Sequence, residues 1–120
     1  MSEPKDPRYY LRLLLESLTS LDEYLSTGLD EFLNNKMLQR AILYCVIEIG
    51  EGVRRLIKYA PDWVAAHPQT NWSGPIQFRD KTSHKYFEID LRLVWDNLTG
   101  PQMLTLKESV FSLAKEHLQD

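Results

Sequence analysis

The sequence predicts an all-α protein, an up-and-down bundle of four to five helices. Apolar residues recur at three- and four-residue steps over long stretches, which is the spacing of one buried helix face. No segment sustains the two-residue alternation of a strand, and no internal repeat or low-complexity tract is present. Prolines, glycines and capping residues divide the chain into pieces of helical length. We therefore expect one helical domain over residues 1–120.

The first two predicted helices are rich in leucine and isoleucine. The first begins near Pro7 and stops before Gly28. Its apolar face comprises Leu11, Leu14, Leu15, Leu18, Leu21 and Leu25. The second runs from about Asn35 to Ala60, where Pro61 prevents its continuation. Its buried stripe is expected to comprise Leu38, Ala41, Ile42, Cys45, Val46, Ile49, Val53, Leu56 and Ile57.

A long connection and a polar helix follow. Residues 61–73 contain two prolines and two tryptophans and are expected to form the connection. Ser73 is the expected cap of a third helix that carries Arg79 through Tyr86.

Two further helices complete the predicted bundle. Asp90 is the expected N-cap of the short helix LRLVWDNL, which ends at Thr99-Gly100-Pro101. The last helix covers roughly 102–118. Its inward residues are expected to be Leu106, Val110, Leu113, Ala114 and Leu118.

The composition is typical of a soluble globular protein, with 43% hydrophobic and 26% charged residues. No apolar run approaches the roughly 18 residues of a membrane span, and the N-terminus lacks a signal-peptide core. The single cysteine, Cys45, cannot form an internal disulfide and is expected to be buried. We expect a cytoplasmic protein without a membrane, metal or cofactor. His67 and His117 are assigned structural or solvent-exposed roles.

The net charge of −3 conceals a basic middle segment. Residues 53–92 carry seven Lys or Arg and four Asp or Glu, a net of +3, whereas the segments on both sides are acidic. Such a segment can attract phosphates even on an acidic protein. The acidic balance and the lack of a basic recognition helix argue against a DNA-binding protein.

The basic segment contains the stretch RDKTSHKYF, residues 79–87. No P-loop, GxGxxG, zinc-spaced Cys/His pair or GxSxG elbow occurs elsewhere. His84 can exchange protons near neutral pH, and Arg79 presents a charged planar fork to phosphate oxygens. Together they suit metal-free cleavage of an RNA phosphodiester, with Lys81 and Lys85 holding flanking phosphates. On chemistry alone, one Arg and one His on a helix more often form a solvated face.

Helix geometry separates the two catalytic candidates. At about 100° per residue, Arg79 and His84 point about 140° apart, whereas Arg79 and Tyr86 share a face. Either the helix distorts near His84 or a second copy of the chain supplies the missing groups. A two-fold pairing of this helix with its twin places two Arg/His sets in one cleft. Catalysis therefore predicts a homodimer.

The octapeptide RDKTSHKY, residues 79–86, resembles the R-x4-H-x-Y motif of HepT-like proteins in the HEPN superfamily. The resemblance extends over about residues 8–116. Upstream, DEFLNNKMLQRAILYCVIEIGEGV is similar to the second-helix region of the family. Trp72 precedes the motif at a similar distance, and FEIDLRLVW follows it as the next helix of the family does.

This resemblance implies a dimeric HEPN bundle that acts as a metal-independent endoribonuclease, the toxin of a toxin–antitoxin pair. RNA is the implied substrate, with tRNA as one candidate, and Arg79 and His84 are the implied catalytic residues. The implied partner is an MntA-like minimal nucleotidyltransferase that silences the toxin by transferring AMP to Tyr86 and can form a larger hetero-oligomer with it. Beside the residues implied by the family, we expect Asp80, Lys81, Lys85 and Glu51 to be supporting or RNA-binding residues. Glu51 is further hypothesised to orient Arg79 through a carboxylate–guanidinium pair.

A second interpretation remains open from the sequence. The chain could be a non-catalytic helical partner or substrate-binding protein of a minimal nucleotidyltransferase, with Arg79 and His84 in ion pairs. Both interpretations share the same bundle, so fold alone cannot separate them.

Overall fold

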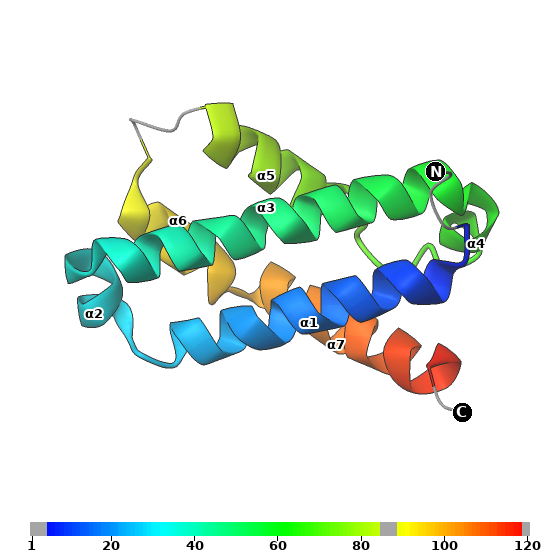
Figure 1. The fold of residues 1–120 in the computed structure, drawn as a ribbon, viewed down its shortest axis with the longest axis horizontal. Coiled ribbons are helices and arrows are strands. Elements are labelled where there is room, and N and C mark those ends of the chain that lie inside the picture. The colour runs from blue at the N-terminus through cyan, green and yellow to red at the C-terminus, as the bar shows by residue number, and fades with distance from the viewer. Residues whose placement is uncertain (1–4, 85–88, 119–120) are drawn as a thin grey trace.

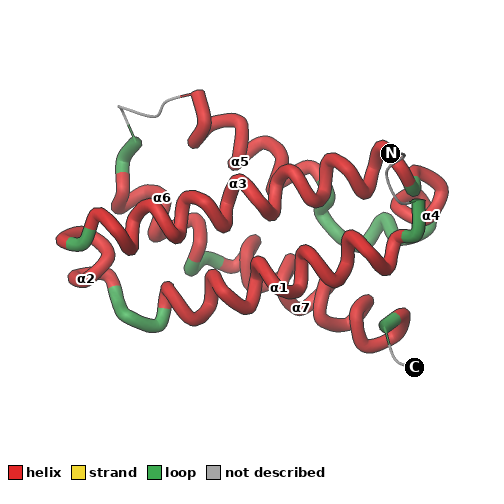
Figure 2. The backbone as a smooth tube through the Cα atoms, in the orientation of Figure 1, coloured by secondary structure: helices red, strands yellow, loops and turns green. Residues whose placement is uncertain are grey.

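Two long helices, α1 (Pro7–Leu25) and α3 (Lys36–Tyr59), lie side by side and form the body of the bundle (Figure 1). The computed structural model describes residues 5–84 and 89–118, and of residues 83 and 84 it describes the backbone alone. The remaining helices within these ranges are α2 (Leu29–Asn34), α4 (Pro61–Ala65), α5 (Ser73–His84), α6 (Leu91–Leu98) and α7 (Pro101–His117). The described ranges contain no strand, as the tube in Figure 2 shows. The predicted all-α class is confirmed.

Side-chain caps fix the starts of three helices at predicted places. The Asp6 carboxylate accepts the Arg8 backbone N–H at 3.0 Å, just before Pro7. Asn35 Oδ1 accepts the Leu38 N–H at 3.1 Å and starts α3. Asp90 Oδ1 accepts two backbone N–H groups of α6, from Arg92 at 3.1 Å and from Leu93 at 3.2 Å. The predicted α6 and its Asp90 cap are thus confirmed.

Two short helices and one cap differ from the prediction. Helix α2 follows Gly28, whose φ of +98° suits glycine. It has six residues and buries only Phe32, so its sequence is too short to show a helical period. Helix α4 occupies the start of the predicted connection, because Pro61 ends α3 and also fits the first turn of a new helix. The cap predicted at Ser73 is wrong. Asn71 Oδ1 accepts the Gly74 N–H at 3.1 Å, and Ser73 is already helical.

The core lies between α1, α3 and α7, and its residues are largely those with helical spacing. The fully buried side chains include Leu11, Leu14, Leu18, Leu21, Ile42, Val53, Leu56 and Val110. Some predicted members are only partly buried, namely Leu15, Leu25, Ala41, Ile57 and Leu118. Within the described ranges, no helix combines the length and apolar character needed to cross a bilayer.

Cys45 is expected to resist alkylation in the folded protein. Its side chain is 3% exposed, and burial, with a smaller contribution from Glu48, raises the pKa of the thiol to about 11. At pH 8 the reactive thiolate is therefore scarce as well as shielded. Intact mass after iodoacetamide treatment should show an unmodified native chain and a singly modified chain in urea. Rapid modification of the native chain would contradict this burial.

Candidate functional site

Gly50 sets the distance between the two helices that carry the predicted site. Helix α5 packs along α3 (Figure 1). Gly50 lies where the two helices meet. A Cβ at this position would lie 2.8 Å from Arg79 Cγ and 2.9 Å from the Pro75 carbonyl oxygen. Both distances are too short for real contacts, so only glycine allows this approach. The next residue of α3, Glu51, consequently lies beside Arg79.

The Arg79 guanidinium is held between two carboxylates. Its Nη2 lies 3.5 Å from Glu51 Oε2, and its Nη1 lies 2.9 Å from Asp80 Oδ1. The Arg79 side chain is 25% exposed, and its Nε is buried without a hydrogen-bond partner among the described residues. The hypothesised contact between Glu51 and Arg79 is thus present in the structure. The two carboxylates therefore fix the orientation of the Arg79 guanidinium group.

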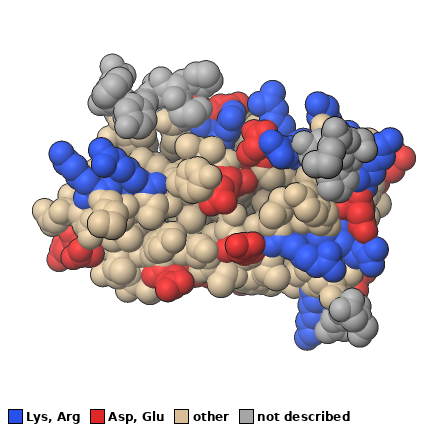
Figure 3. Space-filling model, viewed as in Figure 1, with Lys and Arg blue, Asp and Glu red and all other residues tan. Residues whose placement is uncertain are grey.

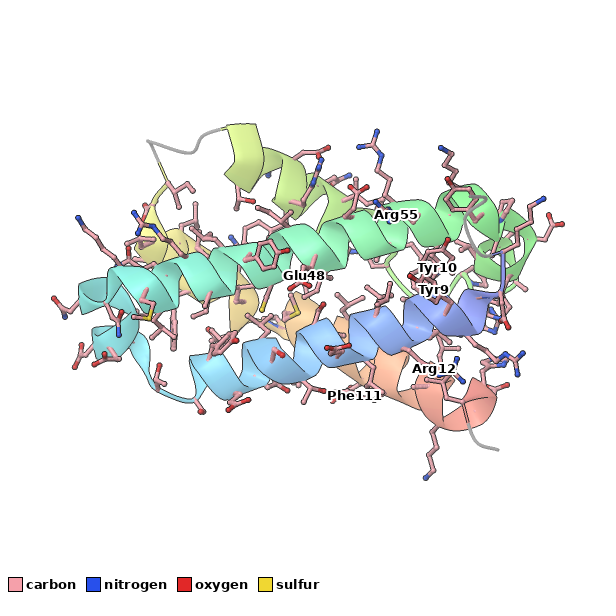
Figure 4. All side chains as sticks on the ribbon, in the orientation of Figure 1. Tyr9, Tyr10, Arg12, Glu48, Arg55 and Phe111 are labelled. Atoms are coloured by element: carbon pink, nitrogen blue, oxygen red, sulfur yellow. The ribbon has the colours of Figure 1, made fainter. Side chains whose placement is uncertain are left out.

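Charged side chains of both signs surround this point. Glu51 Oε1 also accepts from Arg55 Nε at 3.4 Å, so Glu51 bridges two guanidinium groups. Figure 3 shows Lys and Arg side chains along the edge over α3 and α5, with acidic side chains among them. Arg55 projects from α3 on the side where α5 packs (Figure 4). The surface can attract a phosphate backbone but is not uniformly basic.

Of the other predicted residues, Lys81 lies on the side of α5 away from Arg79, and the rest are wholly or partly outside the described residues. Lys81 is exposed, and its position is about 160° around the helix from Arg79. His84 is the last residue of α5, and its side chain lies outside the described residues. Lys85 and Tyr86 lie outside them entirely. The structure therefore brings together Arg79, Asp80 and Glu51.

The two remaining histidines belong to an aromatic cluster between α4 and α7. The His67 ring lies 4.3 Å from the Trp63 ring, and its Nδ1 lies 2.7 Å from the Trp63 carbonyl oxygen. The His117 ring lies 5.5 Å from each of these two rings. This packing agrees with a structural role. In the described ranges, no three His, Cys, Asp or Glu side chains form a group that could hold a metal ion.

Sequence reasoning missed Gly50 as a determinant of the site. The signal was a glycine inside the buried stripe of α3, directly before Glu51. A glycine in a helix interior costs roughly 1 kcal/mol relative to alanine, so it suggests a close approach of another backbone. Only the fold shows that the approaching segment is α5.

Gly50→Ala is expected to destabilise the fold by about 1–3 kcal/mol, because the added methyl group overlaps Arg79 and the α5 backbone. Urea unfolding followed by circular dichroism measures this difference. Gly52→Ala is the matched control on the same helix. Its Cβ would lie 3.1 Å from Leu14 Cδ2, the end of a side chain that can shift. Equal stability of Gly50→Ala and the wild type would show that α5 does not depend on this contact.

Comparison with known proteins gives a consistent family. Residues 14–119 match the family described as ribonuclease HepT-like. A protein of Methanocaldococcus jannaschii named "Putative RNase" is 34% identical, over 87% of this chain and 84% of its own length. The "Probable ribonuclease HepT" of Thermococcus cleftensis is 29% identical, over 87% of this chain and 86% of its own. No solved structure matches the chain significantly.

These matches confirm the predicted family. They also confirm the predicted enzyme class, because the family and both relatives are named as ribonucleases. The matched range contains α5 and the whole R-x4-H-x-Y motif. The chain belongs to the ribonuclease HepT-like family.

Proposed function

We propose that this chain is a metal-independent endoribonuclease and the toxin of a toxin–antitoxin pair. The observation that carries the proposal is the family match over residues 14–119, a range that includes the R-x4-H-x-Y motif. The oriented guanidinium of Arg79 supports it, because a fixed cation beside a scissile phosphate stabilises charge that develops during cleavage.

The proposed reaction needs one proton carrier and one fixed cation. The RNA 2′-hydroxyl attacks the adjacent phosphorus, the bond to the 5′-oxygen breaks, and the products are a 2′,3′-cyclic phosphate and a free 5′-hydroxyl. His84 takes the proton from the 2′-hydroxyl while water protonates the leaving 5′-oxygen, or His84 protonates that oxygen while water takes the 2′-hydroxyl proton. Arg79 stabilises the negative charge on the non-bridging oxygens. Three neighbours of Arg79 and His84 in the sequence are proposed to support RNA binding, namely Asp80, Lys81 and Lys85.

A homodimer is part of this proposal. Arg79 and His84 are five positions apart on α5, so their directions differ by about 140°. Pairing the α5 helices of two copies about a two-fold axis supplies an Arg from one copy and a His from the other. The proposed cleft is therefore composite.

Incubation of the pure chain with total RNA in EDTA tests the proposal. We expect fragments that end in 2′,3′-cyclic phosphate from the wild type and intact RNA with His84→Ala. Intact mass of the same sample establishes whether Tyr86 already carries AMP. If the unmodified wild type and the His84 variant leave RNA equally intact, the nuclease proposal fails.

Glu51→Gln is expected to lower RNA cleavage about tenfold, since Arg79 would keep its charge but lose one of its two carboxylate partners. Arg55→Ala is the control, because it removes the other partner of Glu51 and leaves Arg79 in place. Cleavage rates on one RNA preparation, measured between pH 6 and pH 8, provide the comparison. Full activity of Glu51→Gln would remove the positioning role of Glu51.

Two ion pairs of Arg79 favour a second candidate function. The Arg79 guanidinium already pairs with Glu51 and Asp80, which is what a purely structural arginine would do. In that case the chain is a non-catalytic helical partner of a minimal nucleotidyltransferase. Co-purification with such a protein, together with intact RNA in the assay above, would favour this alternative.

A further inference from the structure

A groove of about 580 Å³ lies between α5, α6 and the first turn of α7. It borders the side of α5 opposite Arg79, because the lining residues Gln77 and Lys81 are each about 160° from it around the helix. Its volume falls within the roughly 300–1,000 Å³ of small-ligand sites. Four carboxamide side chains line it, and we call it the amide groove: Asn71, Gln77, Asn97 and Gln102.

The amide groove offers unused hydrogen-bonding groups of both kinds. Gln77 and Gln102 make no side-chain hydrogen bond with any described residue. Asn71 uses its oxygen for the Gly74 N–H at 3.1 Å, which leaves its NH₂ group for a ligand. Asn97 donates its Nδ2 to the Leu93 carbonyl at 3.1 Å, which leaves its oxygen. Donors and acceptors in one groove match the edges of nucleobases.

An aromatic ring and a cation accompany the carboxamides. Phe78 is half-buried in the lining and offers a flat surface on which a base can stack. Lys81 is exposed at the groove and can pair with a phosphate. The one carboxylate in the lining, Asp90, already accepts the Arg92 and Leu93 N–H groups. This combination of a ring, carboxamides and a cation suits a nucleotide.

We propose that the amide groove binds one nucleotide of single-stranded RNA and selects the base near the cleavage position. This inference rests on the proposed function, because it places the scissile phosphate at Arg79. Helix α5 with its side chains is about 10–12 Å wide, so a strand that crosses it passes from Arg79 to the groove within a few nucleotides. Sequence-specific recognition of RNA relies on such unstacked bases, read by hydrogen bonds and stacking.

Binding measured in a His84→Ala background tests the groove separately from catalysis. Fluorescence anisotropy with RNA oligonucleotides of one length and different bases gives affinity and base preference. Gln77→Ala with Asn97→Ala should lower affinity for the preferred oligonucleotide about tenfold, the effect of one good base contact. Asn34→Ala is the matched control, since Asn34 is exposed on α2 and donates its Nδ2 to the Asp30 carbonyl at 2.8 Å.

Lys81→Gln should make binding less dependent on salt, whereas Lys115→Gln, an exposed change on α7, should not. Unchanged affinity and base preference in the Gln77/Asn97 variant would overturn the inference. Displacement of the RNA by free AMP, at the same total concentration of nucleotides, would also overturn the inference. The groove would then be a site for a free nucleotide.

The inference and the proposed function can fail separately. Intact RNA with the wild type, together with groove-dependent binding, would reject the nuclease and keep the groove. Cleavage at unchanged positions by the Gln77/Asn97 variant in the His84 wild-type chain would reject the groove and keep the nuclease. Circular dichroism of each variant confirms that the bundle is folded.

Discussion

Arg79→Ala is expected to lower the rate of RNA cleavage by about 10²–10³-fold, the usual effect of removing one preorganised group that stabilises transition-state charge. The change removes the cation that Glu51 and Asp80 hold beside the proposed phosphate site. Single-turnover cleavage of one RNA preparation measures the effect without the contribution of product release.

Two further variants show whether the effect depends on the guanidinium group at position 79. Arg79→Lys should recover little of the lost activity, because an ammonium group lacks the planar fork that contacts two oxygens at once. Arg55→Ala removes a more exposed guanidinium from the same edge and should change the rate only slightly. A fully active, folded Arg79→Ala chain would assign this arginine to packing of α5 on α3.

Transfer of AMP to Tyr86 is expected to lower cleavage at least as far as Arg79→Ala does. In the proposed step the Tyr86 hydroxyl attacks the α-phosphorus of ATP, and pyrophosphate leaves. Tyr86 lies outside the described residues, and its spacing of seven positions from Arg79 predicts the same side of an α-helix for both. The attached phosphate would compete with RNA for Arg79, and the nucleotide would occupy the cleft.

Incubation with an MntA-like nucleotidyltransferase, ATP and Mg²⁺ tests this regulation, with intact mass and RNA cleavage measured on the same sample. Tyr86→Phe should gain no mass and remain active in the presence of the transferase. Tyr44→Phe is the matched control, because Tyr44 is an exposed tyrosine on α3 and its loss should leave modification and silencing unchanged. Mass gain on Tyr86→Phe, or a modified wild type that still cleaves RNA, would contradict the proposal.

The long elements of this fold could be predicted because their local signals agree. In α3 the apolar stripe, the Asn35 cap and the stop at Pro61 all indicate the same helix. Helices α2 and α4 have six and five residues, too few to display a period. The cap at Asn71 was missed because Ser73 is an equally good capping residue, and only the path of the chain decides between them.

The site was predictable in part for a related reason. The R-x4-H-x-Y motif is contiguous in the sequence, so Arg79 could be predicted from the motif alone, and the family match covers the whole motif. The contact between Glu51 and Arg79 joins positions 28 residues apart and was a hypothesis until α3 and α5 were placed together. The role of Gly50 depends on how α5 packs against α3, and the amide groove depends on how α5, α6 and α7 pack together. A single sequence carries no direct signal for either arrangement.

Mixing two inactive variants tests whether two subunits share one composite cleft. Arg79→Ala and His84→Ala chains would be unfolded together, refolded together and assayed on RNA, with native mass spectrometry confirming mixed dimers. A mixed dimer retains Arg79 on one subunit and His84 on the other. We therefore expect cleavage to return in the mixture although each variant alone is inactive. Mixed dimers that leave RNA intact would contradict a cleft shared between two subunits.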